Sequence, residues 1–145
     1  MNVAEEIGPA LARSIVSRMG ETGQPPERGA LAVNVGTDDV LSVLREEYLV
    51  PMREAGRNSS FKLVEAPFGG GKTHFLYCLR EVGWREGFAT SIVDVSPEEC
   101  PFDDTLRIYQ AVVRQLELPP DSLAVVPDRG IDAVLRQLQI GRAHV

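Results

Sequence analysis

Apolar residues recur every three or four positions in five stretches of the chain, which is the spacing of a helix with one buried face. In the first stretch, Pro9 near the start and Gly20 at the end delimit an amphipathic helix. In the second, Thr37 is placed to act as the N-cap, and Pro51 is expected to end or kink the helix. The five predicted helices cover residues 9–19, 38–49, 72–82, 103–116 and 131–138.

Short apolar runs lie between these helices and are typical of strands. We expect residues 31–35, 61–66 and 88–95 to be extended, and Gly83 and Gly87 to bracket a turn that contains Trp84. A fourth run, residues 123–126, is interrupted by proline and is interpreted as a connector. The helix of residues 103–116 is expected to turn one apolar side inward. That side consists of Leu106, Tyr109, Val112, Val113 and Leu116.

Length and composition fit one soluble domain with a modest core, since the chain has 145 residues, of which 43% are apolar and 25% charged. No run approaches the length of a membrane span and the first residues lack the regions of a signal peptide, so we expect a cytoplasmic protein without membrane contact. The net charge of −6 argues against a chain that coats nucleic acid through its overall field. Cys78 and Cys100 are isolated, so neither metal nor redox chemistry is indicated.

The pattern with the most chemical content is residues 66–73, a small residue followed by four variable ones and Gly-Lys-Thr, the phosphate-binding loop (Walker A) pattern. Its three glycines remove side chains that would keep phosphate away from the backbone N–H groups. The bland alternative is a glycine-rich turn that binds nothing. The predicted nucleotide-binding residues are Ala66, Pro67, Phe68, Gly69, Gly70, Gly71, Lys72, Thr73 and His74.

Within this loop, Lys72 is the predicted catalytic residue, because its ammonium would reach the β- and γ-phosphates. The Thr73 hydroxyl would complete the shell of a Mg²⁺ ion, and His74 would contribute its backbone N–H with no catalytic role for its ring. The expected ligands are therefore a nucleotide, taken as ATP, and Mg²⁺.

Other candidate sites each have a plainer reading. Asn34, Val35 and Gly36 precede the loop where an adenine pocket is expected, but they also fit a simple turn. Asp94 closes an apolar run, so it resembles a metal-site carboxylate, although a polar residue at a strand end is the better interpretation. The acidic residues Glu98, Glu99, Asp103 and Asp104 are better explained by a solvated loop and a helix N-terminus.

The last six residues, 140–145, look unlike the helix that they follow and resemble the translation of a sequencing adapter. We therefore expect a helix and linker in residues 1–30, the N-terminal part of an ATP-binding domain in residues 31–139, and a non-native tail in residues 140–145. On this interpretation the natural protein is longer than the printed sequence.

Four segments in order resemble the ATP-binding proteins of bacterial BREX phage-defence systems. They are residues 28–36, 65–76, 87–96 and 100–109. The resemblance implies an AAA-related, three-layer α/β P-loop fold with a mainly parallel sheet, preceded by N-terminal helices and here truncated. Only residues 66–73 can be carried over as functional positions, because no motif matches the family's metal-site carboxylates, sensor residue or arginine finger.

The resemblance implies ATP binding, with hydrolysis in the full-length protein that drives assembly or remodelling of a defence complex. Its expected partners are other defence-system proteins, DNA in the full assembly, and further copies of the chain in a homo-oligomer. Two alternatives stay open: a nucleotide-dependent module that switches partners without turnover, and a small-molecule kinase, for which no acceptor site or arginine-rich lid is visible.

Overall fold

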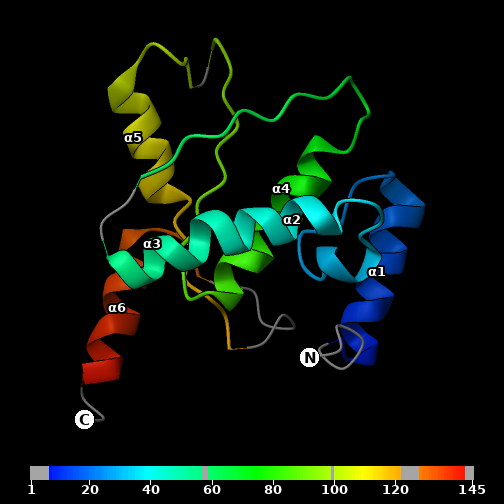
Figure 1. Cartoon of the computed structure of the whole chain (residues 1–145), viewed down its shortest axis with the longest axis horizontal. Coiled ribbons are helices and arrows are strands. Elements are labelled where there is room, and N and C mark those ends of the chain that lie inside the picture. Colours follow the sequence, from blue (N-terminus) through cyan, green and yellow to red (C-terminus); the bar gives the residue numbers. More distant parts are fainter. Residues whose placement is uncertain (1–6, 57–58, 99, 122–127, 143–145) are drawn as a thin grey trace.

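The computed structural model describes residues 7–56, 59–98, 100–121 and 128–142, and the side chains of this last range only as far as Gln137. Helices dominate these residues (Figure 1). In chain order the elements are α1 (Pro9–Thr22), the 3₁₀-helix η2 (Ala30–Val33), α2 (Asp38–Leu44), the π-helix η3 (Arg45–Leu49), α3 (Val50–Ala55), α4 (Lys72–Arg85), α5 (Thr105–Arg114) and α6 (Ile131–Arg142). Within the described residues no helix is long and apolar enough to cross a bilayer.

The expected three-layer α/β fold is wrong, because the described residues contain no strand and no sheet. Residues 31–35 fall largely in η2 and its cap, and residues 61–66 have no regular secondary structure. Residues 88–95 make one isolated bridge, in which Thr90 and Glu117 exchange two backbone hydrogen bonds of 2.8 Å. An apolar run becomes a strand only when a neighbouring run pairs with its backbone, and no ladder joins these three runs within the described residues. The expected connector, residues 123–126, lies outside the described residues.

The core lies where α4 packs against η2 and α2. Its buried members are Ala30, Leu41, Phe75, Cys78 and Val82. In Figure 1, α4 runs through the centre behind α2, with α1 on one side and α3 and α6 on the other. The helix that follows the predicted phosphate loop is therefore the element around which the described chain packs.

Residues 38–55 form one continuous helical rod, so of the two alternatives for Pro51, an end or a kink of the helix, the end is wrong. The turn before the proline widens into η3, and Pro51 then occupies the first turn of α3. A π-turn shifts the hydrogen-bond register, which relieves the carbonyl that a proline cannot pair. The rod ends at Gly56, whose φ of 65° is left-handed.

Helix α4 is longer than predicted, because Gly83 and Trp84 lie inside it and only Gly87, with φ 81°, marks the turn. A Cβ added to Gly83 would lie 3.3 Å from the Thr90 methyl carbon. The glycine therefore permits close packing and does not break the helix. This tight approach is invisible in the sequence pattern.

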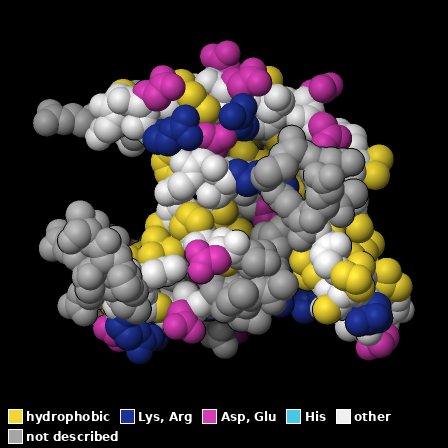
Figure 2. Space-filling view, turned by 90° about the horizontal axis from the view of Figure 1, so that it is seen from below, with side chains coloured by type: hydrophobic (Ala, Val, Ile, Leu, Met, Phe, Trp, Pro, Cys, Tyr) yellow, Lys and Arg dark blue, Asp and Glu magenta, His cyan; other side chains and the backbone are white. Residues whose placement is uncertain are grey.

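Asp104 begins α5 as predicted, since its carboxylate accepts the Arg107 backbone N–H at 3.0 Å. The expected inward apolar side is only partly covered within the described residues, where Val113 and Leu116 are half-buried. Leu106 and Tyr109 are 64% and 65% exposed, and Val112 is also exposed. Figure 2 shows apolar side chains reaching the surface among charged ones on the face seen from below.

Candidate phosphate-binding loop and adjoining cavity

Residues 66–71 form a tight turn that leads directly into α4. Gly69 and Gly71 adopt left-handed φ angles of 77° and 78°, which residues other than glycine rarely adopt. Gly70 N–H donates to the Pro67 carbonyl at 3.0 Å, and a Cβ at Gly70 would lie only 2.9 Å from that oxygen. All three glycines are therefore required by the local geometry, for two different reasons.

The N-terminus of α4 opens onto this turn. Gly71 is the N-cap, no side chain caps the helix, and the first intrahelical bond runs from Phe75 N–H to the Gly71 carbonyl at 2.9 Å. In the part of the chain that the structure describes, no acceptor contacts the N–H groups of Lys72, Thr73 and His74. Unpaired donors and the positive end of the helix dipole together favour an anion at this point.

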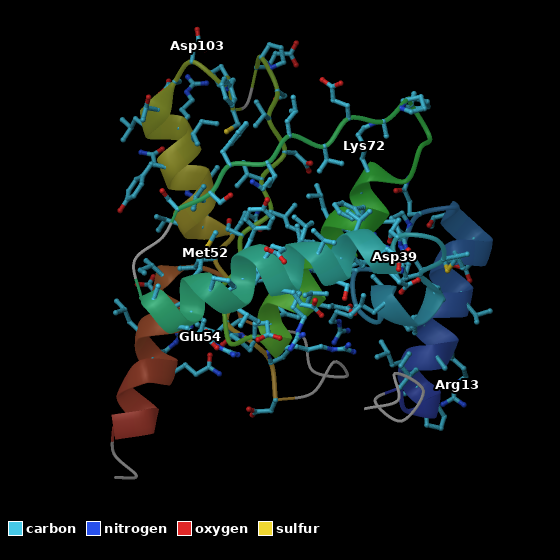
Figure 3. All side chains as sticks on the ribbon, viewed as in Figure 1. Arg13, Asp39, Met52, Glu54, Lys72 and Asp103 are labelled. Carbon is cyan, nitrogen blue, oxygen red and sulfur yellow. The ribbon has the colours of Figure 1, made fainter. Side chains whose placement is uncertain are left out.

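The Lys72 side chain folds back over the loop. Its Nζ donates to the carbonyl oxygens of Ala66, at 2.7 Å, and Pro67, at 2.8 Å. Figure 3 shows Lys72 at the end of α4 that faces the loop. Lys72 and Thr73 are both exposed, so the ammonium and the hydroxyl are accessible to a ligand in the loop. Binding of phosphate at Lys72 would exchange two carbonyl contacts for charged ones, which are stronger.

A cavity of about 500 Å³ adjoins the loop. One side consists of the loop and the first turn of α4, and the other comes from the end of α1, the segment after it and η2. The lining residues are Met19, Gly23, Gln24, Pro25, Pro26, Val33 and residues 68–74. The volume is within the range of small-molecule sites, and the apolar side faces the polar loop.

The apolar side of this cavity is a part of the site that the sequence did not reveal. Pro25 and Pro26 follow a helix and precede a glycine turn, so the pattern indicates only a polar connection. Nothing in such a stretch shows that it returns to the phosphate loop. The only signal was its position, between a helix and the predicted adenine segment.

The predicted adenine segment reaches α4 at one residue. Asn34 accepts at Oδ1 from the Thr37 hydroxyl at 2.6 Å, and its oxygen lies 3.8 Å from Cys78 Sγ, which in turn lies 3.5 Å from His74 Nε2. Val35 is 88% exposed and does not line the cavity. Burial, with smaller contributions from the nearby carboxylates of Glu81 and Asp38, raises the pKa of Cys78 to about 12. The thiol is therefore neutral, and Cys78 contributes packing within α4.

Residues 7–140 match the family described as BREX system ATP-binding protein BrxC/D. The chain belongs to this family. Searches of curated proteins and of solved structures gave no match. The matched residues contain the loop, both sides of the cavity and α4, so every element that builds the candidate site lies within the region that matches the family.

The other acidic candidates of this BREX-family chain lie away from the loop. Asp94 lines a different cavity, of about 460 Å³, beside Arg80 and Glu117. Asp103 and Asp104 lie at the start of α5, and Figure 3 places Asp103 far from Lys72. Glu99 lies outside the described residues. Among the residues that are described, no three His, Cys, Asp or Glu side chains gather as a metal site would require.

Proposed function

We propose that this BREX-family protein binds ATP with its phosphates in the loop of residues 66–73. The observation that carries the proposal is the coincidence of an uncapped 14-residue helix, a glycine turn and an exposed Lys72 at one wall of a cavity. The glycines fit a phosphate group physically, because a Cβ at Gly69 or Gly71 would meet no atom within 4 Å and would project into open space.

Each residue of the loop then has a defined task. The N–H groups of Gly69, Gly71, Lys72, Thr73 and His74 donate to phosphate oxygens, while that of Gly70 stays with the Pro67 carbonyl. Lys72 places a positive charge at the β- and γ-phosphates. The Thr73 hydroxyl is the group that would hold Mg²⁺, which neutralises charge on the phosphate oxygens when it is bound. The base would lie against the apolar side of the cavity, formed by Met19, Pro25 and Val33.

Hydrolysis by the full-length protein is part of this proposal, with Lys72 stabilising the charge that develops between the β- and γ-phosphates. A second function, a nucleotide-dependent switch without turnover, is favoured by one observation. No Asp or Glu lines the loop cavity within the described residues. Phosphate release by the full-length protein with ATP and Mg²⁺ separates the two functions.

We further propose the setting that the family's name suggests. The protein acts in the cytoplasm, in phage defence, together with other components of a BREX system. DNA and further copies of the chain are its additional proposed partners. The net charge of −6 opposes contact with DNA through the overall field, so the proposed contact runs through a local basic surface or a partner protein.

The direct test is ATP binding by the Lys72→Ala protein, measured by calorimetry with Mg²⁺. We expect affinity to fall by at least about tenfold, because a charge-assisted contact to phosphate is lost. Lys62→Ala is the matched control, since Lys62 is the other lysine of the chain and lies over the Tyr48 ring, 3.9 Å from its centre. Equal affinity in the parent and the Lys72→Ala protein would refute the loop assignment.

A further inference from the structure

Helix α4 carries two consecutive buried charged side chains, Arg80 and Glu81, well away from the phosphate loop. Glu81 is 2% exposed, and its carboxylate accepts two backbone N–H groups. Its Oε1 accepts the Ala30 N–H at 3.0 Å and its Oε2 accepts the Leu31 N–H at 3.2 Å. A buried carboxylate is costly unless such donors satisfy it, so these two contacts fix the start of η2 firmly to α4.

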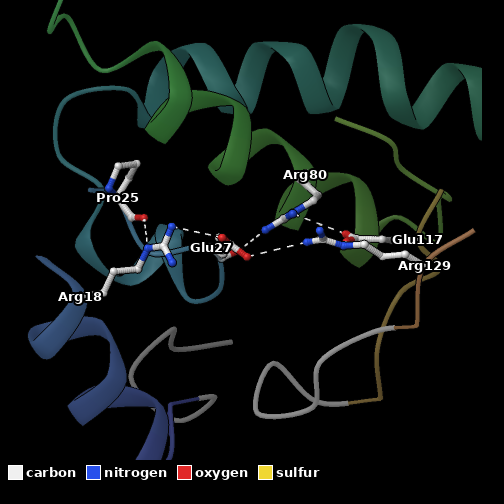
Figure 4. A network of polar contacts seen from close by, with 6 residues as sticks. All are labelled: Arg18, Pro25, Glu27, Arg80, Glu117 and Arg129. Atoms are coloured by element: carbon white, nitrogen blue, oxygen red, sulfur yellow. Dashed lines mark hydrogen bonds and ion pairs between the residues drawn. The ribbon is translucent and has the colours of Figure 1, made fainter. Parts of the chain in front are cut away.

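Arg80 contacts the same segment three residues earlier. Its guanidinium donates to the Glu27 carbonyl oxygen and pairs with Glu117 at 3.4 Å, as Figure 4 shows. Burial lowers the pKa of Arg80, and the carboxylates of Glu117 and Glu81 oppose that effect. On the outer side, Arg18 of α1 donates to the Pro25 carbonyl at 3.1 Å. The segment is thus held from both helices.

We define residues 24–33 as the wall segment, because its two ends form part of the cavity's apolar side. The contacts to Arg80 and Glu81 come from the middle of this segment. Its two ends, Gln24 to Pro26 and Val33, line the loop cavity, and residues 27, 30 and 31 between them bind α4. Helix α4 begins at Lys72, so the same rigid helix carries the phosphate loop at its start and contacts the wall segment through Arg80 and Glu81. These two residues lie about 13 Å further along the helix axis than Lys72.

We propose that Arg80 and Glu81 are positioning residues that set the wall segment relative to the phosphate loop. In this way they give the site its preference for a nucleotide over a bare polyphosphate. This inference rests on the proposed function. It assigns the role to residues that do not touch the ligand. The loop binds phosphate with or without the Arg80 and Glu81 contacts. The base adds binding affinity only when the wall segment lies at the correct distance from the loop.

The test compares two ligands that differ in the base. Affinities for ATP and for tripolyphosphate are measured with Mg²⁺ on the parent and on Glu81→Gln, whose amide cannot accept both N–H groups. We expect the ratio of ATP to tripolyphosphate affinity to fall about tenfold, with tripolyphosphate affinity changed by less than about twofold. An unchanged ratio, or an equal loss for both ligands, would overturn the inference.

The matched control is Glu86→Gln. Glu86 is an equally buried carboxylate at the end of α4, but it pairs with Arg45 and Arg53 and not with the wall segment. We expect this variant to lose stability and keep the ligand ratio. If Glu81→Gln does not fold, Arg80→Lys is judged by the same ratio, because the shorter lysine has one terminal nitrogen and loses the fork that contacts both Glu27 and Glu117. In the parent, ATP but not tripolyphosphate should slow hydrogen exchange at the Ala30 and Leu31 amides, and equal slowing by both ligands would contradict the inference.

The proposed function and this inference fail in different ways. If Lys72→Ala binds tripolyphosphate as tightly as the parent does, the loop is not the phosphate site and the proposed function is wrong. If Lys72→Ala weakens tripolyphosphate but Glu81→Gln leaves the ratio unchanged, the loop assignment stands and only the positioning role is lost.

Discussion

Cys78 shows how strongly a single residue can depend on its place on α4. Its side chain is fully buried and contacts His74 on one side and Asn34 on the other. Since the surroundings are apolar or negatively charged, ionisation of the thiol is disfavoured and its pKa is raised to about 12. A thiol that stays neutral is a poor nucleophile, so Cys78 contributes packing to the helix that carries the phosphate loop.

This shift predicts a dependence of stability on pH. The unfolded thiol ionises near its ordinary value of 9.0, whereas the folded thiol keeps its proton up to about 12. Below pH 9 both states are protonated and stability is unaffected; as pH rises from 9 to 12 the unfolded state is favoured and stability is lost. We expect the free energy of unfolding at pH 10 to fall by about 1 kcal/mol more in the parent than in Cys78→Ala. Denaturant titrations at pH 7.5 and 10 measure this, and equal losses in both proteins would contradict it.

The sequence predicts why glycine is needed at two positions of the loop but not why it is needed at the third. The need for left-handed angles at Gly69 and Gly71 follows from the phosphate-loop pattern, because the turn into the helix is part of that pattern. The need at Gly70 arises from the close approach of the Pro67 carbonyl, which depends on how the loop folds. In the same way, Glu81 looks like an ordinary polar position of a helix until its contacts to Ala30 and Leu31 are seen.

At the scale of elements, the helices were largely predictable and the extended segments were not. Apolar periodicity located α1, α2, α4, α5 and α6, since a helix forms its own backbone hydrogen bonds. Residues 61–66 and 88–95 have strand-like composition, but a strand depends on a partner that local sequence does not specify. The expectation that Pro51 could end the helix was wrong for a related reason. The π-helix η3 in the preceding residues accommodates the proline, and local sequence does not specify that turn.

An ionic junction between Glu86, Arg45 and Arg53 ties the rod formed by α2, η3 and α3 to the end of α4. Glu86 is buried and accepts from Arg45 at 2.5 Å and from Arg53 at 2.6 Å. Because it serves both arginines, its removal would leave two cations without their acceptor. The junction therefore aligns the far end of the rod with the end of the loop helix.

We expect Glu86→Gln to lower the free energy of unfolding by about 2 kcal/mol, since charge-assisted hydrogen bonds at a buried carboxylate are lost. Glu47→Gln is the control, because Glu47 is an exposed residue of the same rod and its change should stay within about 0.5 kcal/mol. Urea unfolding of the three proteins measures both values. Similar stabilities for the two variants would mean that the junction contributes little.

At the scale of the whole molecule, the sequence identified the family but not the arrangement of the chain around the predicted phosphate loop. The phosphate-loop pattern and the flanking segments were sufficient to indicate the BREX ATP-binding family, which the match over residues 7–140 confirms. The layered sheet inferred from that resemblance was wrong for the described residues. The pairing of distant segments, such as the wall segment with α4, decides the arrangement, and no periodicity within one segment contains that information.

The contrast between α4 and α5 gives a test of the arrangement as a whole. Phe75 of α4 is 8% exposed within the core, whereas Leu106 of α5 is 64% exposed despite lying on the apolar side of its helix. Phe75→Ala should therefore lower the free energy of unfolding by about 3–5 kcal/mol, while Leu106→Glu should change it by less than about 0.5 kcal/mol. A layered sheet covering α5 would bury Leu106 and make its charged variant as damaging as the loss of Phe75. Chemical denaturation of both variants separates the two arrangements, because only an uncovered α5 tolerates the carboxylate at that position.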